Sequence, residues 1–423
     1  MRRADNAEMV LSRRDAVVVF LTFAFAYFFS ALVRAVTATL APTLTQEFAL
    51  QARDLGLLAG GYFLGFAASQ LPLGRWLDAH GPKKVLLGFL AVAVVGCVAF
   101  SLADNFATLL AARVLCGVGL GACLMAPLTG FRRWLEPAVQ LRANSWMLMT
   151  GSLGMVASTL PVQWMVPLVG WRPLFWVLGL LLVAAMLLTA LRVPNWPAAE
   201  PAASATHGAR PADAGRARAS YGEVWRHPYF RRLTPVGFIS YGGMIAMQTL
   251  WAGPWMVRVA GYEPLAAAAG LFTINVCMLL TFLSWGLLNP WLAGRGIGTD
   301  RLIGWGLPLS FLMLGSIIVR GEDAGAWAWA AFCVSCTFVS LAQPAVGMAF
   351  PSALAGRALS AYNLVIFGGV FIVQWGIGLL IDGFLRFGLD TVGSFRAALS
   401  VFLVSSVAAW VYFLRGPRDN PPQ

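Results

Sequence analysis

Apolar runs long enough to cross a membrane recur along the whole chain, with short polar breaks between them. Each run holds about 18–27 residues, and a helix of that length, rising 1.5 Å per residue, spans the roughly 30 Å hydrocarbon core of a bilayer. The sequence therefore predicts about twelve membrane-spanning helices. We place them at 16–40, 54–73, 85–103, 106–131, 145–168, 172–193, 233–257, 265–291, 302–319, 326–349, 360–384 and 393–414.

The composition also requires the bilayer as part of the solvent. Of the 423 residues, 59% are hydrophobic and only 11% are charged, and the mean hydropathy is +0.73. A soluble domain carries roughly a quarter charged residues. Backbone groups in lipid must be satisfied within the protein, which leaves helices or closed barrels, and continuous rather than alternating apolar runs favour helices. The predicted fold class is all-α, a polytopic membrane protein.

A change of composition divides the chain into two halves. Residues 194–232 are rich in proline, alanine and charge, a composition that cannot span lipid and is typical of a flexible linker. We expect six-helix bundles at 1–193 and 233–423, on either side of this linker. The equal numbers of runs indicate a duplicated, pseudo-symmetric architecture.

The basic residues predict the orientation. Arg2, Arg3, Arg13 and Arg14 precede the first run, and cytoplasmic loops carry an excess of Lys and Arg. We therefore expect both termini and the linker in the cytoplasm, with the chain in a bacterial-type inner membrane. The net charge of +12 is explained by these loops and predicts no nucleic-acid partner. We expect a monomer with the lipid bilayer as its surroundings.

The reactive residue types favour no catalytic chemistry. All six cysteines fall inside apolar runs, so we expect no disulfide, and we interpret the Cys333-x-x-Cys336 pair as packing rather than as a metal or redox site. The three histidines lie in predicted loops, and no paired carboxylates or nucleophile–base set appears within the runs. The sequence predicts neither an enzyme nor a cofactor or metal.

The break between the runs 54–73 and 85–103 carries a distinctive string. Gly81 can take a positive φ in a tight reversal, and lysines at the start of the next helix can anchor it at anionic headgroups. A carboxylate in such a basic loop can accept hydrogen bonds from a helix N-terminus and from nearby cations. The string has the pattern G-x-x-x-D-x-x-G-x-K-K and comprises Gly74, Asp78, Gly81, Lys83 and Lys84.

This string resembles the signature loop of the major facilitator superfamily. The family also places an arginine early in its fourth helix in the pattern R-x-x-x-G-x-G, which here is Arg113, Gly117 and Gly119. The resemblance covers nearly the whole chain and implies alternating access, in which two halves rock around a site near the midplane. It further implies that Asp78 latches the cytoplasmic side closed near the start of the run 360–384. The matching loop of the second half is degraded, with Pro290 where an acid is expected.

Two arginines fall well inside the predicted spans. Burying a charged side chain in the bilayer costs free energy, so we interpret each of them as a candidate functional residue. Arg34 and Arg113 share a depth of roughly 10–12 Å from the outer surface, counted at 1.5 Å per residue. Arg34 also shares a helix face with Tyr27, Ser30 and Thr37. A structural role for Arg113, through backbone carbonyls, and snorkelling of Arg34 to the surface are the alternatives.

Polar residues in the second half complete the candidate substrate site. Tyr241, Met244, Gln248 and Trp251 repeat the spacing of the stripe on the first run. Buried amides can also act as bonds between helices, and this alternative stays open for each of them. The further candidates inside the spans are Asn275, Gln343 and Asn363.

Two intramembrane arginines without an intramembrane acid predict an electropositive cavity and hence an anionic small-molecule substrate. The pattern weakly resembles the anion:cation symporter branch of the superfamily, although Leu120 stands near the place of a carboxylate found in some relatives. We expect a secondary active transporter, a proton-coupled symporter of a small organic anion. A proton-driven exporter of drugs or metabolites is the alternative, although the run 145–168 lacks the Gly-Pro pair usual in such exporters. A non-transporting sensor with the same fold is a further possibility.

Overall fold

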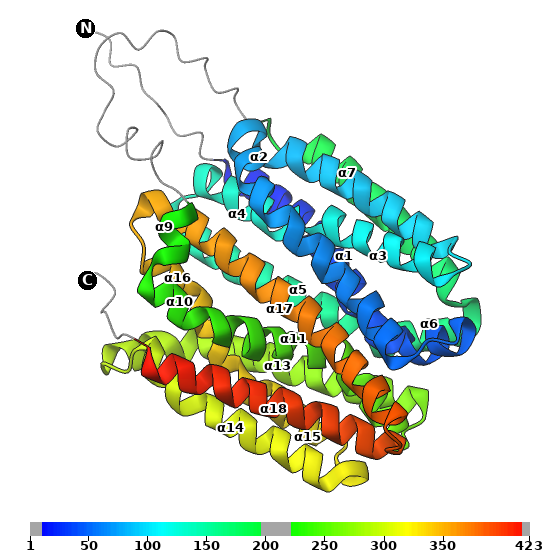
Figure 1. Ribbon diagram of the computed structural model, residues 1–423. Helices are drawn as coiled ribbons and strands as arrows, with labels where there is room; N and C mark the ends of the chain where they lie inside the picture. The colour runs from blue at the N-terminus through cyan, green and yellow to red at the C-terminus, as the bar shows by residue number, and fades with distance from the viewer. Residues whose placement is uncertain (1–10, 196–220, 417–423) are drawn as a thin grey trace, which may run out of the picture.

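The computed structural model describes residues 11–195 and 221–416, and within these ranges the regular elements are helices. Residues 1–10, 196–220 and 417–423 lie outside the described ranges, and with them most of the predicted linker. Figure 1 shows the helices of the first half, α1–α7, beside those of the second half, α9–α18. The predicted all-α membrane fold is confirmed.

The first half follows the predicted runs closely. Runs 54–73 and 85–103 lie together on α2, run 106–131 is shared by α3 and α4, and run 145–168 is shared by α5 and α6. The helices are α1 (Arg13–Phe48), α2 (Ala52–Ser101), α3 (Phe106–Leu120), α4 (Ala122–Trp134), α5 (Pro137–Ala157), α6 (Leu160–Val169) and α7 (Trp171–Arg192).

The second half begins inside the predicted linker, because 221–226 and 228–232 are helical. Run 233–257 is divided among five short helices, two of them π-helices. The elements are α9 (Tyr221–Arg226), α10 (Pro228–Pro235), η1 (Val236–Tyr241), α11 (Gly242–Ala246), η2 (Met247–Trp251), α12 (Ala252–Arg258), α13 (Pro264–Gly294), α14 (Thr299–Arg320), η3 (Gly321–Asp323), α15 (Ala326–Cys336), η4 (Thr337–Leu341), α16 (Ala342–Met348), α17 (Ser352–Arg386) and α18 (Thr391–Arg415).

Merged and broken helices reconcile the structure with the twelve predicted spans. In the described ranges, nine helices are each long and apolar enough to cross a membrane, and the pair α5–α6, bent by 42°, makes ten. Gly81 divides α2 into two spans, because its φ of 75° and ψ of 167° turn the chain, as expected for this glycine. Counting α2 twice and the broken run 233–257 once gives twelve.

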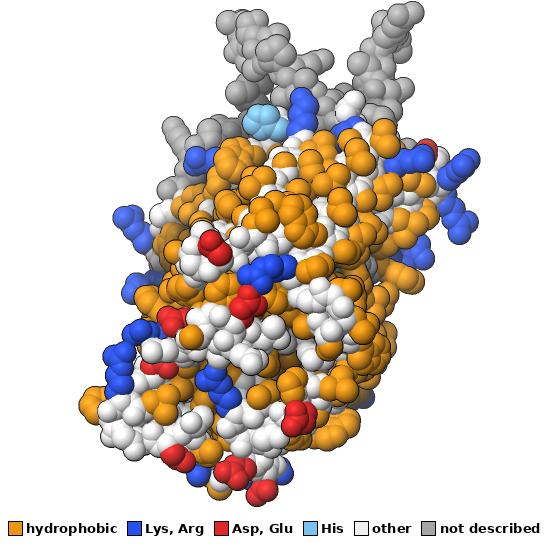
Figure 2. All heavy atoms as spheres, turned by 90° about the vertical axis from the view of Figure 1, so that its right-hand side faces the viewer, with side chains coloured by type: hydrophobic (Ala, Val, Ile, Leu, Met, Phe, Trp, Pro, Cys, Tyr) orange, Lys and Arg blue, Asp and Glu red, His pale blue; other side chains and the backbone are white. Residues whose placement is uncertain are grey.

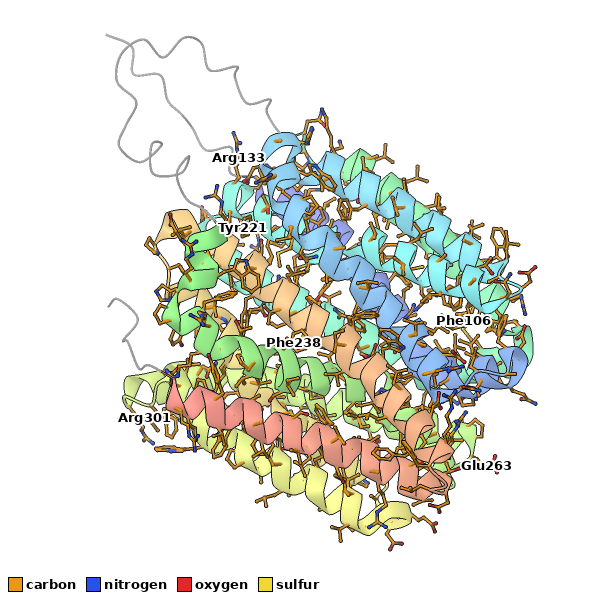
Figure 3. The ribbon with its side chains drawn as sticks, in the orientation of Figure 1. Phe106, Arg133, Tyr221, Phe238, Glu263 and Arg301 are labelled. Atoms are coloured by element: carbon orange, nitrogen blue, oxygen red, sulfur yellow. The ribbon has the colours of Figure 1, made fainter. Side chains whose placement is uncertain are left out.

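The bundle has two ends, which the chain itself distinguishes. The terminal end, where α1 begins and α18 ends, carries Arg133, Tyr221 and Arg301 (Figure 3). The distal end carries Phe106 and Glu263, and Phe238 lies between the two ends. Figure 2 looks onto the distal end, where acidic and basic side chains lie among broad apolar areas.

The two halves pack together from the distal end to the middle of the bundle, mainly along α2 and α17 (Figure 1). Gly56 and Gly378 allow main-chain contact there, since a Cβ at either glycine would collide with backbone atoms of the opposite helix. Deeper in the bundle, the rings of Phe66 and Phe367 have centroids 4.4 Å apart. Small residues at such crossings let helix backbones approach closely in a membrane.

Asp382 holds the two halves together at the distal end. Its carboxylate accepts the backbone N–H groups of Ala52 at 3.1 Å and Arg53 at 2.9 Å, which are the first two residues of α2. The first N–H groups of a helix have no partner within the helix and carry partial positive charge. An acid on α17, in the second half, therefore caps a helix of the first half.

The terminal end shows no comparable closure. Asp78 is exposed and forms no ion pair with any described residue. A Cβ added at Gly74 or at Gly356, near the start of α17, would meet no atom within 4 Å. In this conformation, which is closed at the distal end, Asp78 thus makes no ion pair with the described side chains at the start of the eleventh span.

We predict that Asp382→Asn loosens the distal end, because the amide loses the charge that the α2 N-terminus favours. A reporter cysteine at Ala267, which lines a cavity of about 10 Å³ between α1, α12 and α13, should react about tenfold faster with a maleimide, the factor expected from one charge-assisted hydrogen bond. Asp54→Asn is the matched control, because the contacts of Asp54, with the N–H of Gln51 and the side chain of Arg53, stay within the first half. Equal reaction rates in both variants would contradict the latch.

Candidate functional site

Arg113 is fully buried and directed at the main chain of α1. Its Nη1 donates to the Val33 carbonyl at 2.8 Å and its Nη2 to the Arg34 carbonyl at 3.3 Å. The guanidinium also lies over the ring of Tyr62, with 5.1 Å from Cζ to the ring centroid. These contacts join α3, α1 and α2, and they support the structural interpretation of Arg113.

Arg34 supplies one of these two carbonyls, but its own side chain is bound differently. Its side chain is half-buried and interacts with the hydroxyl of Tyr27, and its Nη2 lies 3.9 Å from the sulfur of Met155. No carboxylate of the described residues lies within ion-pair distance of it. The phenols of Tyr27, Tyr62 and Tyr241 lie within electrostatic range of the guanidinium. Arg34 is thus a charge near the middle of the bundle without a counter-ion among the described residues.

The predicted stripe on α1 faces the interior. Tyr27, Ser30 and Thr37 are all buried. Ser30 donates to the carbonyl of Leu120 at 3.5 Å, and Tyr27 lies against Gly151, where a Cβ would collide with its ring. Three of the four stripe residues are therefore buried in the interior, while the guanidinium of Arg34 interacts with Tyr27 and Met155 and has no carboxylate partner among the described residues.

The predicted polar residues of the second half pair with one another. Gln248 donates to Asn275 at 3.0 Å, and Gln343 donates to Asn363 at 2.7 Å. Each bond links two spans, which supports the alternative that these amides connect helices. None of the four is placed against Arg34 by a described contact.

The side chains of Trp251 and Gln248 reach different helices, although the sequence predicts that they share one helix face. Gln248 reaches α13, whereas Trp251 reaches α17. Its Nε1 donates to the backbone carbonyl of Gln374 on α17 at 3.1 Å. The π-helical turns of η1 and η2 account for the difference, because extra residues in a turn rotate the following side chains around the helix. In this segment the 3.6-residue spacing therefore does not bring Gln248 and Trp251 to the same neighbouring helix.

Buried polar atoms without a partner mark residues that the sequence analysis did not single out. Among the described residues they include the hydroxyls of Tyr62 and Ser240 and the Oε1 of Gln374. Tyr62 lies within electrostatic range of both Arg34 and Arg113. Ser240 directly precedes Tyr241 in the sequence. Buried polar atoms are nearly always paired, so such atoms are available to a bound solute or water. A tyrosine and a glutamine inside apolar runs were the sequence signals for two of them.

The motif loop lies at the terminal end, away from these residues. Gly81 makes the predicted turn, Lys84 is exposed and Lys83 is half-buried. All six cysteines are free, and no group of three metal-binding side chains occurs among the described residues. Arg34, with the phenols of Tyr27, Tyr62 and Tyr241 around it, is therefore the candidate binding site, and the motif loop lies apart from it at the terminal end.

We predict that Arg113→Gln destabilises the protein, whereas Arg34→Gln leaves the melting temperature nearly unchanged. Removing the Arg113 guanidinium removes two buried hydrogen bonds from a charged donor, at about 1.5–3 kcal/mol each, whereas Arg34 is half-buried and interacts only with the Tyr27 hydroxyl and the Met155 sulfur among the described residues. Thermal melting of the purified variants measures the difference. Equal melting temperatures would show that Arg113 is not a structural tie.

Solved structures of other transporters share this fold. A bacterial homologue of the human lysosomal transporter Spinster, in an inward-facing and unoccupied conformation, matches 96% of this chain and 97% of its own with a TM-score of 0.75 at 18% identity. A D-xylose–proton symporter matches 96% of this chain and 99% of its own with a TM-score of 0.75 at 13% identity. At these identities the likeness shows the fold.

Curated relatives include transporters of organic anions and a drug exporter. A probable sulfoacetate transporter of Cupriavidus necator is 28% identical over 56% of either chain, so this chain spans about half its length. A 3-(3-hydroxyphenyl)propionate transporter of Escherichia coli is 25% identical over 89% of either chain. A multidrug resistance protein of Escherichia coli is 28% identical over 38% of this chain and 42% of its own.

A family model matches most of the chain. The model describes the Major Facilitator Superfamily and covers residues 23–374, which include the motif loop, both intramembrane arginines and eleven of the twelve spans at least in part. The fold, the loop with its turn at Gly81 and this match agree. The protein is a membrane transporter that belongs to the major facilitator superfamily.

Proposed function

We propose that the protein imports a small organic anion across a bacterial inner membrane, with a proton as the coupling ion. The observation that carries the proposal is Arg34, a half-buried cation without a carboxylate partner among the described residues. An unpaired charge in low dielectric is costly, so a bound anion would relieve it. A guanidinium can hold a carboxylate or sulfonate through two parallel hydrogen bonds.

The surroundings of Arg34 favour an anion that also carries an apolar or hydroxylated group. Tyr27 and Tyr62 of the first half and Tyr241 of the second lie around its charge. Two named relatives transport 3-(3-hydroxyphenyl)propionate and sulfoacetate, and a third, from Pseudomonas aeruginosa, transports 4-hydroxybenzoate. These three anions are the compounds to test first.

The proposed cycle is alternating access by a monomer with both termini in the cytoplasm. The distal end is then the outer side, closed by Asp382 on the start of α2. The terminal end is the cytoplasmic side, where Gly74, Asp78, Gly81, Lys83 and Lys84 would form the gate that closes when the distal end opens. The linker between the halves would cross on this side.

Export of drugs or metabolites is the second candidate. It is favoured by the multidrug relative, whose match covers 38% of this chain. The two candidates differ in the direction of net flux, and in whether an anion is required. Uptake of labelled 4-hydroxybenzoate into right-side-out vesicles with an imposed proton gradient separates import from export. Import predicts accumulation of the label inside the vesicles, and a protonophore should abolish it.

We predict that Arg34→Gln lowers affinity for the transported anion by roughly a hundredfold or more, because a charge-assisted pair in a dry site is lost. Arg34→Lys should retain part of the affinity, since lysine keeps the charge without the planar fork. Thermal shift with each of the three anions, and with a neutral amide analogue of each, measures binding. Arg396→Gln, at an exposed arginine of the distal end, is the control. Unchanged binding in Arg34→Gln would overturn the anion proposal.

A further inference from the structure

The helices α13 and α14 are consecutive in the chain but do not pack closely on each other. Only Arg295–Gly298 joins them, and both pack instead on α15 between them. The space that they leave is a groove of about 400 Å³ floored by α15 and η4. Its walls include Trp285 and Leu288 on α13 and Leu309 and Met313 on α14.

The interior of the groove suits a hydrocarbon chain. Trp285 Nε1 donates to the hydroxyl of Thr337 at 2.8 Å, and that hydroxyl donates to a carbonyl of its own helix at 2.7 Å. The hydroxyls of Thr281, Ser284 and Ser335 likewise donate to carbonyls of their own helices. With its hydroxyl and indole donors used internally, the groove offers little to a polar solute and an apolar surface to a lipid tail.

The groove opens toward a basic loop at the terminal end. Arg295 lies about 10 Å beyond Leu288 along the helix direction, and Arg301 lies about 12 Å before Leu309, at 1.5 Å per residue. Both arginines are exposed, and neither forms an ion pair with a described residue. Arg295 stacks on Trp291, with 3.6 Å from Cζ to the ring centroid, an aromatic pairing suited to the membrane interface.

The acid nearest this loop in the sequence, Asp300 in the first turn of α14, is paired with other residues of the protein. Asp300 accepts Arg232 Nη1 at 2.6 Å and the hydroxyl of Tyr229 at 3.0 Å. Arg232 also donates to the carbonyl of Phe413, so the cluster ties α10, α14 and α18 together. The charge of Asp300 is thereby neutralised within the protein, and the two exposed arginines leave the mouth of the groove positive.

We propose that this groove binds one anionic phospholipid, with an acyl chain between α13 and α14 and its phosphate at Arg295 and Arg301. The proposal rests on two features that lie together. The groove is apolar and large enough for an acyl chain, and Arg295 and Arg301, which have no ion-pair partner among the described residues, lie at its end where lipid headgroups would be. Basic residues beside the bilayer attract anionic headgroups, and an apolar cleft adds the selectivity of a fitted chain. A bound chain would also fill the space that two consecutive spans leave open.

The test uses the purified full-length protein in detergent, with dioleoylphosphatidylglycerol and dioleoylphosphatidylcholine as probes. Native mass spectrometry counts the bound lipid, and thermal melting against lipid concentration gives the affinity. We expect one phosphatidylglycerol to be retained, with at least tenfold preference over phosphatidylcholine, roughly the effect of two charges near a membrane surface. The readout requires no transport, so it stands apart from the proposed substrate.

Three variants locate the lipid. The double variant Arg295→Gln/Arg301→Gln should lose about tenfold or more in phosphatidylglycerol affinity, and Ala331→Phe, which fills part of the groove, should weaken both lipids. Arg226→Gln/Arg231→Gln removes two exposed arginines from the same half away from the groove and should change neither. An equal loss in this control, or full retention in the first two variants, would overturn the site.

Discussion

In hydrocarbon every polar group must find its partner inside the protein, and the two intramembrane arginines meet this requirement in opposite ways. The guanidinium of Arg113 donates hydrogen bonds to two carbonyls of α1 and lies over the ring of Tyr62. It thereby fixes the segment of α1 that carries Arg34. Arg34, without a counter-ion among the described residues, is left available to a solute. One arginine thus positions the backbone from which the other acts.

The contact between the halves obeys the same requirement. At the distal end, Asp382 supplies the partner that the free N–H groups at the start of α2 need, and glycines bring the backbones of α2 and α17 together. Such contacts can be broken only if water or another polar group replaces them. Contacts of this kind favour a hinge that alternates between discrete states, as the proposed cycle requires.

The sequence was sufficient for the spans and for the turn at Gly81, because apolar length and a positive φ leave local signatures. The α1 stripe was also predictable, since 3.6-residue periodicity holds in a regular helix. The same reasoning failed for Trp251, where η1 and η2 change the periodicity. It could place Arg113 inside a span but could not give its partners, and it did not single out Asp382. The hydrogen-bond partners of Arg113 and Asp382 lie 79 to 330 residues away along the chain, and only the fold brings them together.

In the proposed cycle the two halves rock so that the distal contact and the terminal gate close in turn, and an anion at Arg34 stabilises one of the two states. Spin labels at Ala79→Cys and Gly356→Cys, both exposed at the terminal end, report this motion as a distance distribution. The account predicts a long distance without substrate and a shift in populations when the transported anion is added, absent in Arg34→Gln. A single distance that no anion changes, in protein shown to transport, would contradict it.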